Sequence, residues 1–377
     1  MTTQKILSMM IIFVLLFSAC EKDKSTDEKD PIGNENSDDC MELSVLDDSY
    51  RLYRYVQFIN DNEAWIVAGR KDDVFANYLL KTEDAGATWN LINSDLQLIQ
   101  NNHVFSGESI RFINSTDGFA IVKPLCYEGK LNLAYTTDKG ATWQKIPDIV
   151  TNFTSYTWQP AIAYNSTHTL FLGKNLDYKH LLVVIVDNAT KTVSDFYEYD
   201  NFSNLGINAF MTSLSGLHFA ENGTITAVVE GEGNSGAQNR IAQSSDYGVT
   251  WTIRTTMDFP DVETADWVGD DFAYINGKKN SYRTTDAGLS WTEFETPDFK
   301  CLSFADTNNG IALTDFDFYT TTDGGSTWTK LDCGVLNGID DYLDYPSVNN
   351  GWIFGSKTLT DNNELTIVRG FYRYKGE

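Results

Sequence analysis

The chain has 377 residues, 53 of them acidic and 28 basic, which gives a formal charge of −25 at neutral pH. This balance argues against a nucleic-acid partner, whose phosphates need a basic surface, and against binding to anionic lipid headgroups. Part of the negative charge serves solubility. The length would ordinarily indicate two domains, but a repeat fold can reach it as one unit.

The N-terminus predicts export and a lipid anchor. An apolar run at 6–17 is followed by Ser18-Ala19-Cys20. The run is too short for a membrane-spanning helix and matches the core of a signal peptide. Small residues before a cysteine resemble the lipobox of bacterial lipoproteins, with Phe17 where leucine is usual. We expect a signal peptide at residues 1–19 and lipidation of Cys20; the alternative is ordinary secretion with a free Cys20.

Residues 20–40 read as the lipidated cysteine and a disordered acidic tether, because almost nothing in them is apolar. The acidic run directly after Cys20 resembles the export signal of surface lipoproteins in Bacteroidetes-type bacteria. This favours an outer-membrane lipoprotein displayed on the cell surface over one on the periplasmic face.

Four further cysteines are Cys40, Cys126, Cys301 and Cys333. In an exported protein they can form two disulfides with three possible pairings, or remain buried thiols. Their spacing does not indicate zinc, and we predict no metal.

Five segments share the pattern Ser/Thr-x-Asp-x-Gly-x-Ser/Thr-Trp, here called the Asp box. Their aspartate and tryptophan residues are Asp84 and Trp89, Asp138 and Trp143, Asp246 and Trp251, Asp286 and Trp291, and Asp323 and Trp328. Each position has a physical role in a hairpin. The carboxylate accepts N–H groups of a tight turn, glycine takes the positive-φ position, the hydroxyl ties the turn to the next strand, and tryptophan packs into a seam. We therefore interpret these aspartates as structural and predict no catalytic residue among them.

A second pattern, an aromatic residue followed by a polar turn and a strand, comes about 20 to 30 residues before each box. Clear copies span 58–65, 112–119 and 304–311, and looser copies start at Ala163, Phe219, Trp267 and Pro346. These are seven inner hairpins, so each repeat reads as strand A, turn, strand B, loop, strand C, box and strand D.

This repeat predicts an all-β fold, a seven-bladed β-propeller over residues 41–377. The box missing between Asp138 and Asp246 is replaced by a degenerate hairpin at 183–191. The last repeat lacks a strand D, and a spare strand at 41–46 precedes the first repeat. We expect this N-terminal strand to pair with 365–374 and close the ring.

The boxes and inner hairpins together resemble the Asp-box (BNR) propellers of the photosystem II assembly/stability-factor type. The likeness covers about 41–377 and implies a seven-bladed scaffold that binds protein; nothing in the sequence indicates photosynthesis. Sialidases also contain Asp boxes. The chain lacks their Arg-Ile-Pro motif, and only Arg54 and Arg111 are obvious inner-strand arginines, which argues against that activity.

The loops at the end opposite the boxes vary most and suit a binding face. Candidate residues there are Arg70, Tyr127, Glu128, Trp158, Tyr178, Asp315, Asp317 and Tyr342. Aromatic rings beside carboxylates can hold a sugar, and a carboxylate pair can hydrolyse a glycosidic bond; the plainer interpretation is solvated loop residues. One alternating aspartate pair is too few ligands for calcium.

No phosphate-binding loop, nucleophile elbow or dinucleotide fingerprint occurs, and we predict no cofactor. The sequence favours a membrane-anchored, non-catalytic propeller that binds a protein partner or acts in assembly at the cell envelope. The alternative is a cell-surface glycan-binding or glycoside-active protein.

Overall fold

All regular elements that the structure describes are β-strands. The computed structural model describes residues 41–44, 50–70, 78–93, 103–124, 132–146, 161–174, 181–199, 214–233, 236–254, 259, 262–277, 280–315, 317–331, 336–347, 350–361 and 364–374. The chain divides into residues 1–37 and 38–377, and every described residue belongs to the second unit. The predicted signal peptide, Cys20 and tether lie outside the described residues.

The described strands form seven four-stranded antiparallel sheets, and in six of them four consecutive strands pair in chain order. The first sheet contains β2 (Tyr50–Phe58), β3 (Ala64–Arg70), β4 (Tyr78–Thr82) and β5 (Asn90–Asn93). The second contains β6 (His103–Phe112), β7 (Gly118–Pro124), β8 (Asn132–Thr136) and β9 (Gln144–Lys145). The third contains β10 (Ala161–Tyr164), β11 (His168–Lys174), β12 (Leu181–Asp187) and β13 (Val193–Tyr199).

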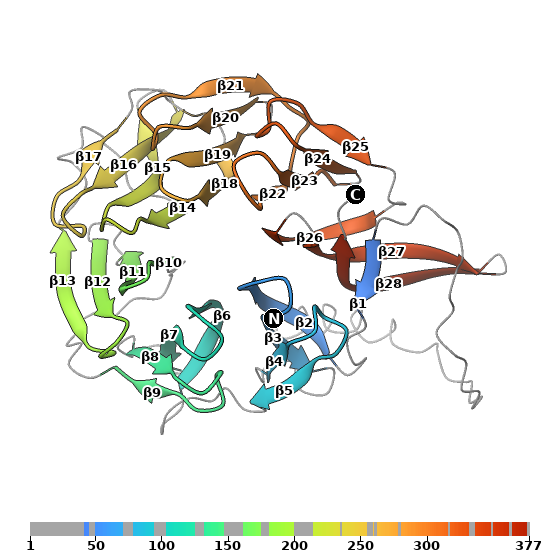
Figure 1. Ribbon diagram of the computed structural model, residues 1–377, viewed down its shortest axis with the longest axis horizontal. Coiled ribbons are helices and arrows are strands. Elements are labelled where there is room, and N and C mark those ends of the chain that lie inside the picture. Colours follow the sequence, from blue (N-terminus) through green and yellow to red (C-terminus); the bar gives the residue numbers. More distant parts are fainter. Residues whose placement is uncertain are drawn as a thin grey trace, which may run out of the picture. The chain divides into compact units, whose positions relative to one another are not determined.

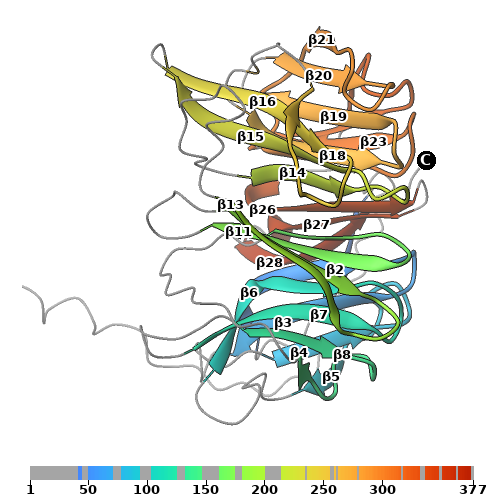
Figure 2. The same ribbon diagram turned by 90° about the vertical axis from the view of Figure 1, so that its left-hand side faces the viewer.

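The fourth to sixth sheets follow the same order. The fourth contains β14 (Leu214–Phe219), β15 (Ile225–Gly233), β16 (Gly236–Ser244) and β17 (Thr252–Ile253). The fifth contains β18 (Val262–Val268), β19 (Phe272–Gly277), β20 (Asn280–Thr284) and β21 (Thr292–Glu295). The sixth contains β22 (Cys301–Phe304), β23 (Gly310–Leu313), β24 (Phe318–Thr321) and β25 (Thr329–Leu331). The long β15–β16 hairpin extends beyond its neighbours when the sheets are seen from the side (Figure 2).

The remaining sheet joins the two ends of the described chain. It contains β26 (Leu336–Ser347), β27 (Asn350–Asp361), β28 (Glu364–Tyr374) and β1 (Met41–Ser44). Its order is β26, β27, β28, β1, with Met41 opposite Tyr374 and Ser44 opposite Phe371.

One edge strand of each sheet contacts the corresponding edge strand of the next sheet. These inner strands are β2, β6, β10, β14, β18, β22 and β26, and β26 also contacts β2. They lie on the inside of the arrangement drawn in Figure 1, with β5, β9, β13, β21 and β25 on the outside. This arrangement confirms the predicted all-β β-propeller.

The middle strands are apolar on both faces because sheets cover them from both sides. Ala64, Trp65, Ile66, Val67 and Ala68 of β3 are all fully buried. An exposed sheet face would instead alternate polar and apolar residues. The core therefore lies between the sheets as well as within each one, and no sheet can bury its own faces alone.

Buried polar side chains also connect neighbouring sheets. Gln57 at the end of β2 donates from Nε2 to the Phe112 carbonyl and accepts from the Phe112 N–H, both at 2.8 Å. In the same way, Asp266 Oδ2 accepts the N–H of Phe304 at 2.7 Å across the seam between the fifth and sixth sheets. These side chains satisfy buried backbone groups that have no strand partner on that side.

We expect Gln57→Leu to lower the free energy of unfolding by about 2–3 kcal/mol. The substitution leaves the buried N–H and carbonyl of Phe112 without their hydrogen-bond partner. Urea denaturation measures the change. The matched control is Gln144→Leu, at an exposed position where the side chain only accepts a bond from the Tyr135 hydroxyl. The control should stay within about 0.5 kcal/mol of the wild type. Equal effects of the two substitutions would contradict the role of Gln57 in connecting the two sheets.

Candidate functional site

The Asp boxes share one hydrogen-bond network, which the second box illustrates. Asp138 Oδ1 accepts the Thr136 hydroxyl and the Thr142 N–H, both at 2.8 Å, and Oδ2 accepts the Thr142 hydroxyl at 2.6 Å. The Thr136 oxygen in turn accepts the N–H of Gly140 at 3.0 Å. Equivalent bonds surround Asp84, Asp246, Asp286 and Asp323. The carboxylates are thus engaged inside their own hairpins.

The pKa values of all five box carboxyls lie below the ordinary aspartate value. For Asp138, partial burial raises the pKa, but the hydrogen bonds from the Thr142 side chain and backbone and from Thr136 outweigh it and lower the pKa. The same balance lowers the pKa of Asp84, Asp246 and Asp323, while at Asp286 the bonds from Ser290 are the leading cause. The carboxylates are therefore ionised at neutral pH and unsuited to act as proton donors.

Two successive residues in each box have positive φ. Gly140 has a φ of 90° and the preceding Lys139 a φ of 65°. The pairs Ala85 and Gly86, Tyr247 and Gly248, Ala287 and Gly288, and Gly324 and Gly325 repeat this conformation. The sequence pattern predicted the glycine but not its left-handed predecessor.

In four of the five boxes, a backbone hydrogen bond joins the box to the turn of the inner hairpin of the same sheet. Lys139 donates its backbone N–H to the Thr116 carbonyl at 2.9 Å, and Gly324 donates to the Asn308 carbonyl at 2.8 Å. The boxes and the inner turns therefore lie at the same end of the sheets, as the repeat pattern predicted. This end is called the box end below.

Four of the five box tryptophans reach into the seams between sheets, whereas Trp89 packs against its own sheet. Trp143 Nε1 donates to the Gly140 carbonyl at 3.1 Å, and its ring lies edge-on to Phe112. The same cluster contains Trp65 and Leu79 of the preceding sheet. Trp251 and Trp291 make the equivalent bond to their box glycine, whereas Trp328 donates to the Tyr274 hydroxyl of the preceding sheet.

The third sheet has a different hairpin in place of a box, between β12 and β13, as predicted for 183–191. Asp187 Oδ1 accepts the N–H groups of Ala189 and Thr190 at 2.9 and 2.7 Å. Lys191, at a φ of 60°, contacts Asp117 of the second sheet with 2.5 Å between Nζ and Oδ2. An ion pair thus spans this seam.

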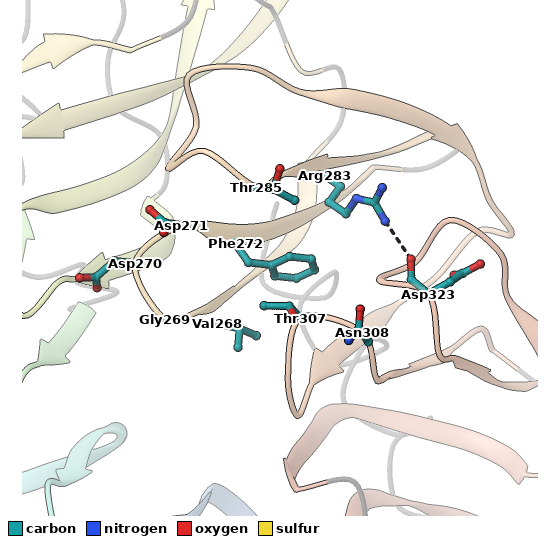
Figure 3. A pocket seen from close by; sticks show the side chains of 10 residues that line it. All are labelled: Val268, Gly269, Asp270, Asp271, Phe272, Arg283, Thr285, Thr307, Asn308 and Asp323. Carbon is teal, nitrogen blue, oxygen red and sulfur yellow. Dashed lines mark hydrogen bonds between the residues drawn. The ribbon is translucent and has the colours of Figure 1, made fainter.

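A cavity of about 600 Å³ opens at the box end between the fifth and sixth sheets (Figure 3). It is lined by Val268, Gly269, Asp270, Asp271, Phe272, Arg283, Thr285, Thr307, Asn308 and Asp323. The β18–β19 turn forms one wall, and the β22–β23 turn and the sixth-sheet box form the others. The site is therefore built from turns of two neighbouring repeats.

Arg283 fixes one wall of the cavity. From β20, its Nη1 donates to the carbonyls of Asp323 and Gly324 at 2.9 and 2.8 Å and to the Ser326 hydroxyl at 2.8 Å. Its guanidinium lies 4.9 Å from the centre of the Phe294 ring. No sequence pattern predicted this role, because the acceptors are mostly backbone carbonyls about forty residues away in the chain.

The opposite wall carries two exposed carboxylates. Asp270 Oδ1 lies 3.2 Å from His218 Nε2 of the fourth sheet, and the His218 ring stacks on Trp267 with 5.2 Å between ring centres. Burial lowers the pKa of His218 and outweighs the opposing effect of Asp270. His218 is therefore neutral at neutral pH and leaves the charge of Asp270 largely uncompensated.

The cavity is not at the face that the loop pattern proposed. Of the candidate residues, Tyr127, Glu128, Trp158 and Tyr178 lie outside the described residues, while Arg70 ends β3 and Tyr342 lies in β26. Asp315 is exposed, and Asp317 pairs with Lys330 at 2.6 Å.

The predictions about the cysteines and about metal binding concern residues that the structure describes only in part. Cys301 is buried at the start of β22, whereas Cys40, Cys126 and Cys333 fall outside. The described residues contain no grouping of three or more His, Cys, Asp or Glu side chains suited to a metal ion. Within them, too, no helix has the length and apolar character to cross a membrane.

Comparison with known proteins establishes the fold. No family model and no curated protein sequence matches the chain. Among solved structures, the chain is similar to "YCF48 bound to D1 peptide", with 16% identity and a TM-score of 0.58 over 91% of this chain and 99% of that one. It is also similar to the β-propeller domain of the Trilobed protease from Pyrococcus furiosus (11% identity, TM-score 0.52, 87% and 95% covered). A third is polysaccharide lyase Uly1 (9% identity, TM-score 0.52, 93% and 94% covered).

Asp138→Ala should lower the free energy of unfolding by about 1–2 kcal/mol, because two hydroxyls and a turn N–H lose a charged acceptor. The folded-state pKa of this carboxyl is depressed, so its contribution is present above the ordinary aspartate pKa and is lost as the pH falls through the folded value. Chemical denaturation at neutral pH and in acid measures both effects. The matched control is Asp315→Ala at an exposed loop; a difference between wild type and Asp138→Ala that stays constant into strong acid would contradict this account.

Proposed function

We propose that the chain is a non-catalytic β-propeller, tethered to the cell envelope through Cys20, that binds a protein partner. The observation that carries the proposal is the cavity between the fifth and sixth sheets. Its walls are turns that backbone bonds and Arg283 hold in place. A rigid recess that needs no reordering on binding suits recognition.

A similar fold is known with a peptide bound, as the name "YCF48 bound to D1 peptide" states. That fact concerns the other protein, but it supports peptide recognition as a use of this scaffold. A role in assembly, as the Asp-box resemblance implies, is part of the same proposal. Affinity purification of the lipidated full chain from its native membrane tests it: a reproducible protein partner is expected, and its absence would sink the proposal.

Glycan binding is the second candidate function, because Uly1, a polysaccharide lyase, shares the fold. The carboxylates, Arg283 and Asn308 of the cavity are groups that bond sugar hydroxyls. However, Phe272 is only 3% exposed, so the cavity floor offers no open ring face on which a sugar stacks. A glycan-array screen of the purified chain separates the two candidates.

We also propose that the seven sheets are seven blades of one ring and that β1 is its clasp. The pairing of β1 with β28 and the contact of β26 with β2 support this interpretation. The clasp would protect a strand edge that would otherwise be open to aggregation.

Two truncations test the clasp. Deleting residues 21–38 should leave the melting temperature unchanged, because the segment precedes β1. Deleting residues 21–48 removes β1 and should lower the melting temperature by several degrees and increase aggregation. Equal melting temperatures for the two truncations would rule out the clasp.

The anchor has its own test. Cys20→Ser should release the protein from the membrane fraction, because the acyl chains are the proposed attachment. Ultracentrifugation followed by immunoblotting measures the release, and Cys301→Ser serves as the matched control that stays in the membrane. Protease treatment of intact cells tests the proposed surface display. A Cys20→Ser protein that remains in the membrane fraction would overturn the anchor.

A further inference from the structure

We propose that β13, the outer strand of the third sheet, is a docking edge to which an extended, non-acidic segment of a partner protein adds as a further strand. The inference rests on the proposed protein-binding function and deepens it, because it adds a contact surface and names the chemistry of the segment that binds there. It combines the length of this edge, the exposure of Phe196 and the charge of the chain.

The edge formed by β13 is longer than the outer edges of the other box-bearing sheets. Among the described residues, β13 has seven residues, whereas the outer strands β5, β9, β17, β21 and β25 have 4, 2, 2, 4 and 3. A very short outer strand is one means by which proteins keep a sheet edge from pairing with another chain. β13 lacks that protection and lies on the outside of the arrangement in Figure 1.

The missing Asp box accounts for this length. In the first sheet the seven residues 83–89 separate the third strand from the outer one, whereas in the third sheet only the five residues 188–192 do so. The outer strand therefore begins sooner and pairs along the whole of β12. The pairing shifts once, near Ser194, and is regular over residues 195–199. Five regularly paired residues make an edge as long as an ordinary strand.

The exposed apolar residue on this edge is aromatic. Phe196 is 41% exposed, although Val184, directly opposite it on β12, is buried. Its neighbours Asp195 and Tyr197 lie on the other face of the strand, where the Asp195 carboxylate accepts the Tyr197 hydroxyl at 3.1 Å. The edge thus offers one apolar and one polar face to an added strand, and an apolar side chain opposite Phe196 removes its ring from water.

The backbone and the charge of the chain together select the occupant. An edge strand offers N–H and C=O groups at the spacing of a β-ladder, so the group that fits it is another extended backbone. A second copy of the chain brings a formal charge of −25 against an equal charge, and Asp195 repels an acidic residue at the edge itself. A foreign segment with apolar, hydroxyl and basic side chains meets neither obstacle.

The test uses the full chain and two fluorescein-labelled peptides of the sequence Lys-Thr-Val-Thr-Val-Thr-Lys, one of them N-methylated at its three central residues. Methylation removes the N–H donors that a ladder needs and keeps the side chains. We expect the unmodified peptide to bind more tightly by about tenfold, because several backbone hydrogen bonds are lost together. Fluorescence anisotropy measures the affinities, and hydrogen exchange should show protection at residues 195–199 in the complex.

Two serine substitutions separate this edge from exposed apolar residues in general. Phe196→Ser should weaken binding of the unmodified peptide by about fivefold, the contribution of an aromatic cross-strand pair. The matched control is Leu91→Ser, at a position 48% exposed on the four-residue outer strand β5, which should keep the affinity within about twofold. Equal affinities of the two peptides, no binding of either, or equal effects of the two substitutions would each overturn the inference. Melting curves confirm that both variants are folded.

The native partner makes failure of this inference distinguishable from failure of the proposed function. Phe196→Ser should lose most of the partner captured by the wild type, and Leu91→Ser should retain it. Undiminished capture by both variants would overturn β13 as a docking edge while leaving the protein-binding function in place. Sedimentation of the purified chain tests the other occupant: a wild-type dimer that Phe196→Ser abolishes would overturn the choice of a foreign segment.

Discussion

The seams between sheets are the constraint on which the rest of the structure depends. The middle strands of the first six sheets have buried apolar residues on both faces, and a single four-stranded sheet of this kind cannot remove them from water. Trp65 and Phe112 show the solution: they come from neighbouring sheets and stack with 3.9 Å between ring centres. Burial of one sheet's faces therefore requires a neighbouring sheet.

The polar groups at the box end follow from that constraint. An aromatic ring packs well between two sheets only if the backbone that carries it is held in place. The box holds that backbone through a carboxylate that accepts hydrogen bonds within its own hairpin. Trp143 then projects from a hairpin whose geometry does not depend on the seam. Charged pairs such as Lys191 and Asp117 add a second link between sheets at the same end. Such partly buried pairs position neighbouring elements more than they stabilise them.

The sequence predicted the hairpins well because each box position has one physical requirement. It did not predict the left-handed conformation of Lys139 or Tyr247, since neither residue type favours it. At these positions the hydrogen bonds of the box hold the backbone in the left-handed conformation, which costs about 1 kcal/mol. The contacts of Arg283 were equally hidden, because a bond to a distant backbone carbonyl leaves no pattern in the residues that accept it.

The predicted binding face stays a prediction, because four of its eight residues lie outside the described part of the chain. Variation in loop length points to the end opposite the boxes, whereas the cavity lies at the box end, where the turns are regular.

The position of the cavity has a structural cause in the inner turns. At other seams, polar side chains fill the space between successive turns: Glu63 accepts the Ser115 hydroxyl, and Ser166 donates its N–H to Glu221. In the β18–β19 turn, Gly269 has a φ of 62°, and a Cβ built there would meet nothing within 4 Å. The open space beside Gly269 borders the cavity, while Asp266 and Arg283 bridge the same seam elsewhere. A repeat scaffold can thus hold a recess at one seam without altering the boxes or the seam contacts that hold the fold together.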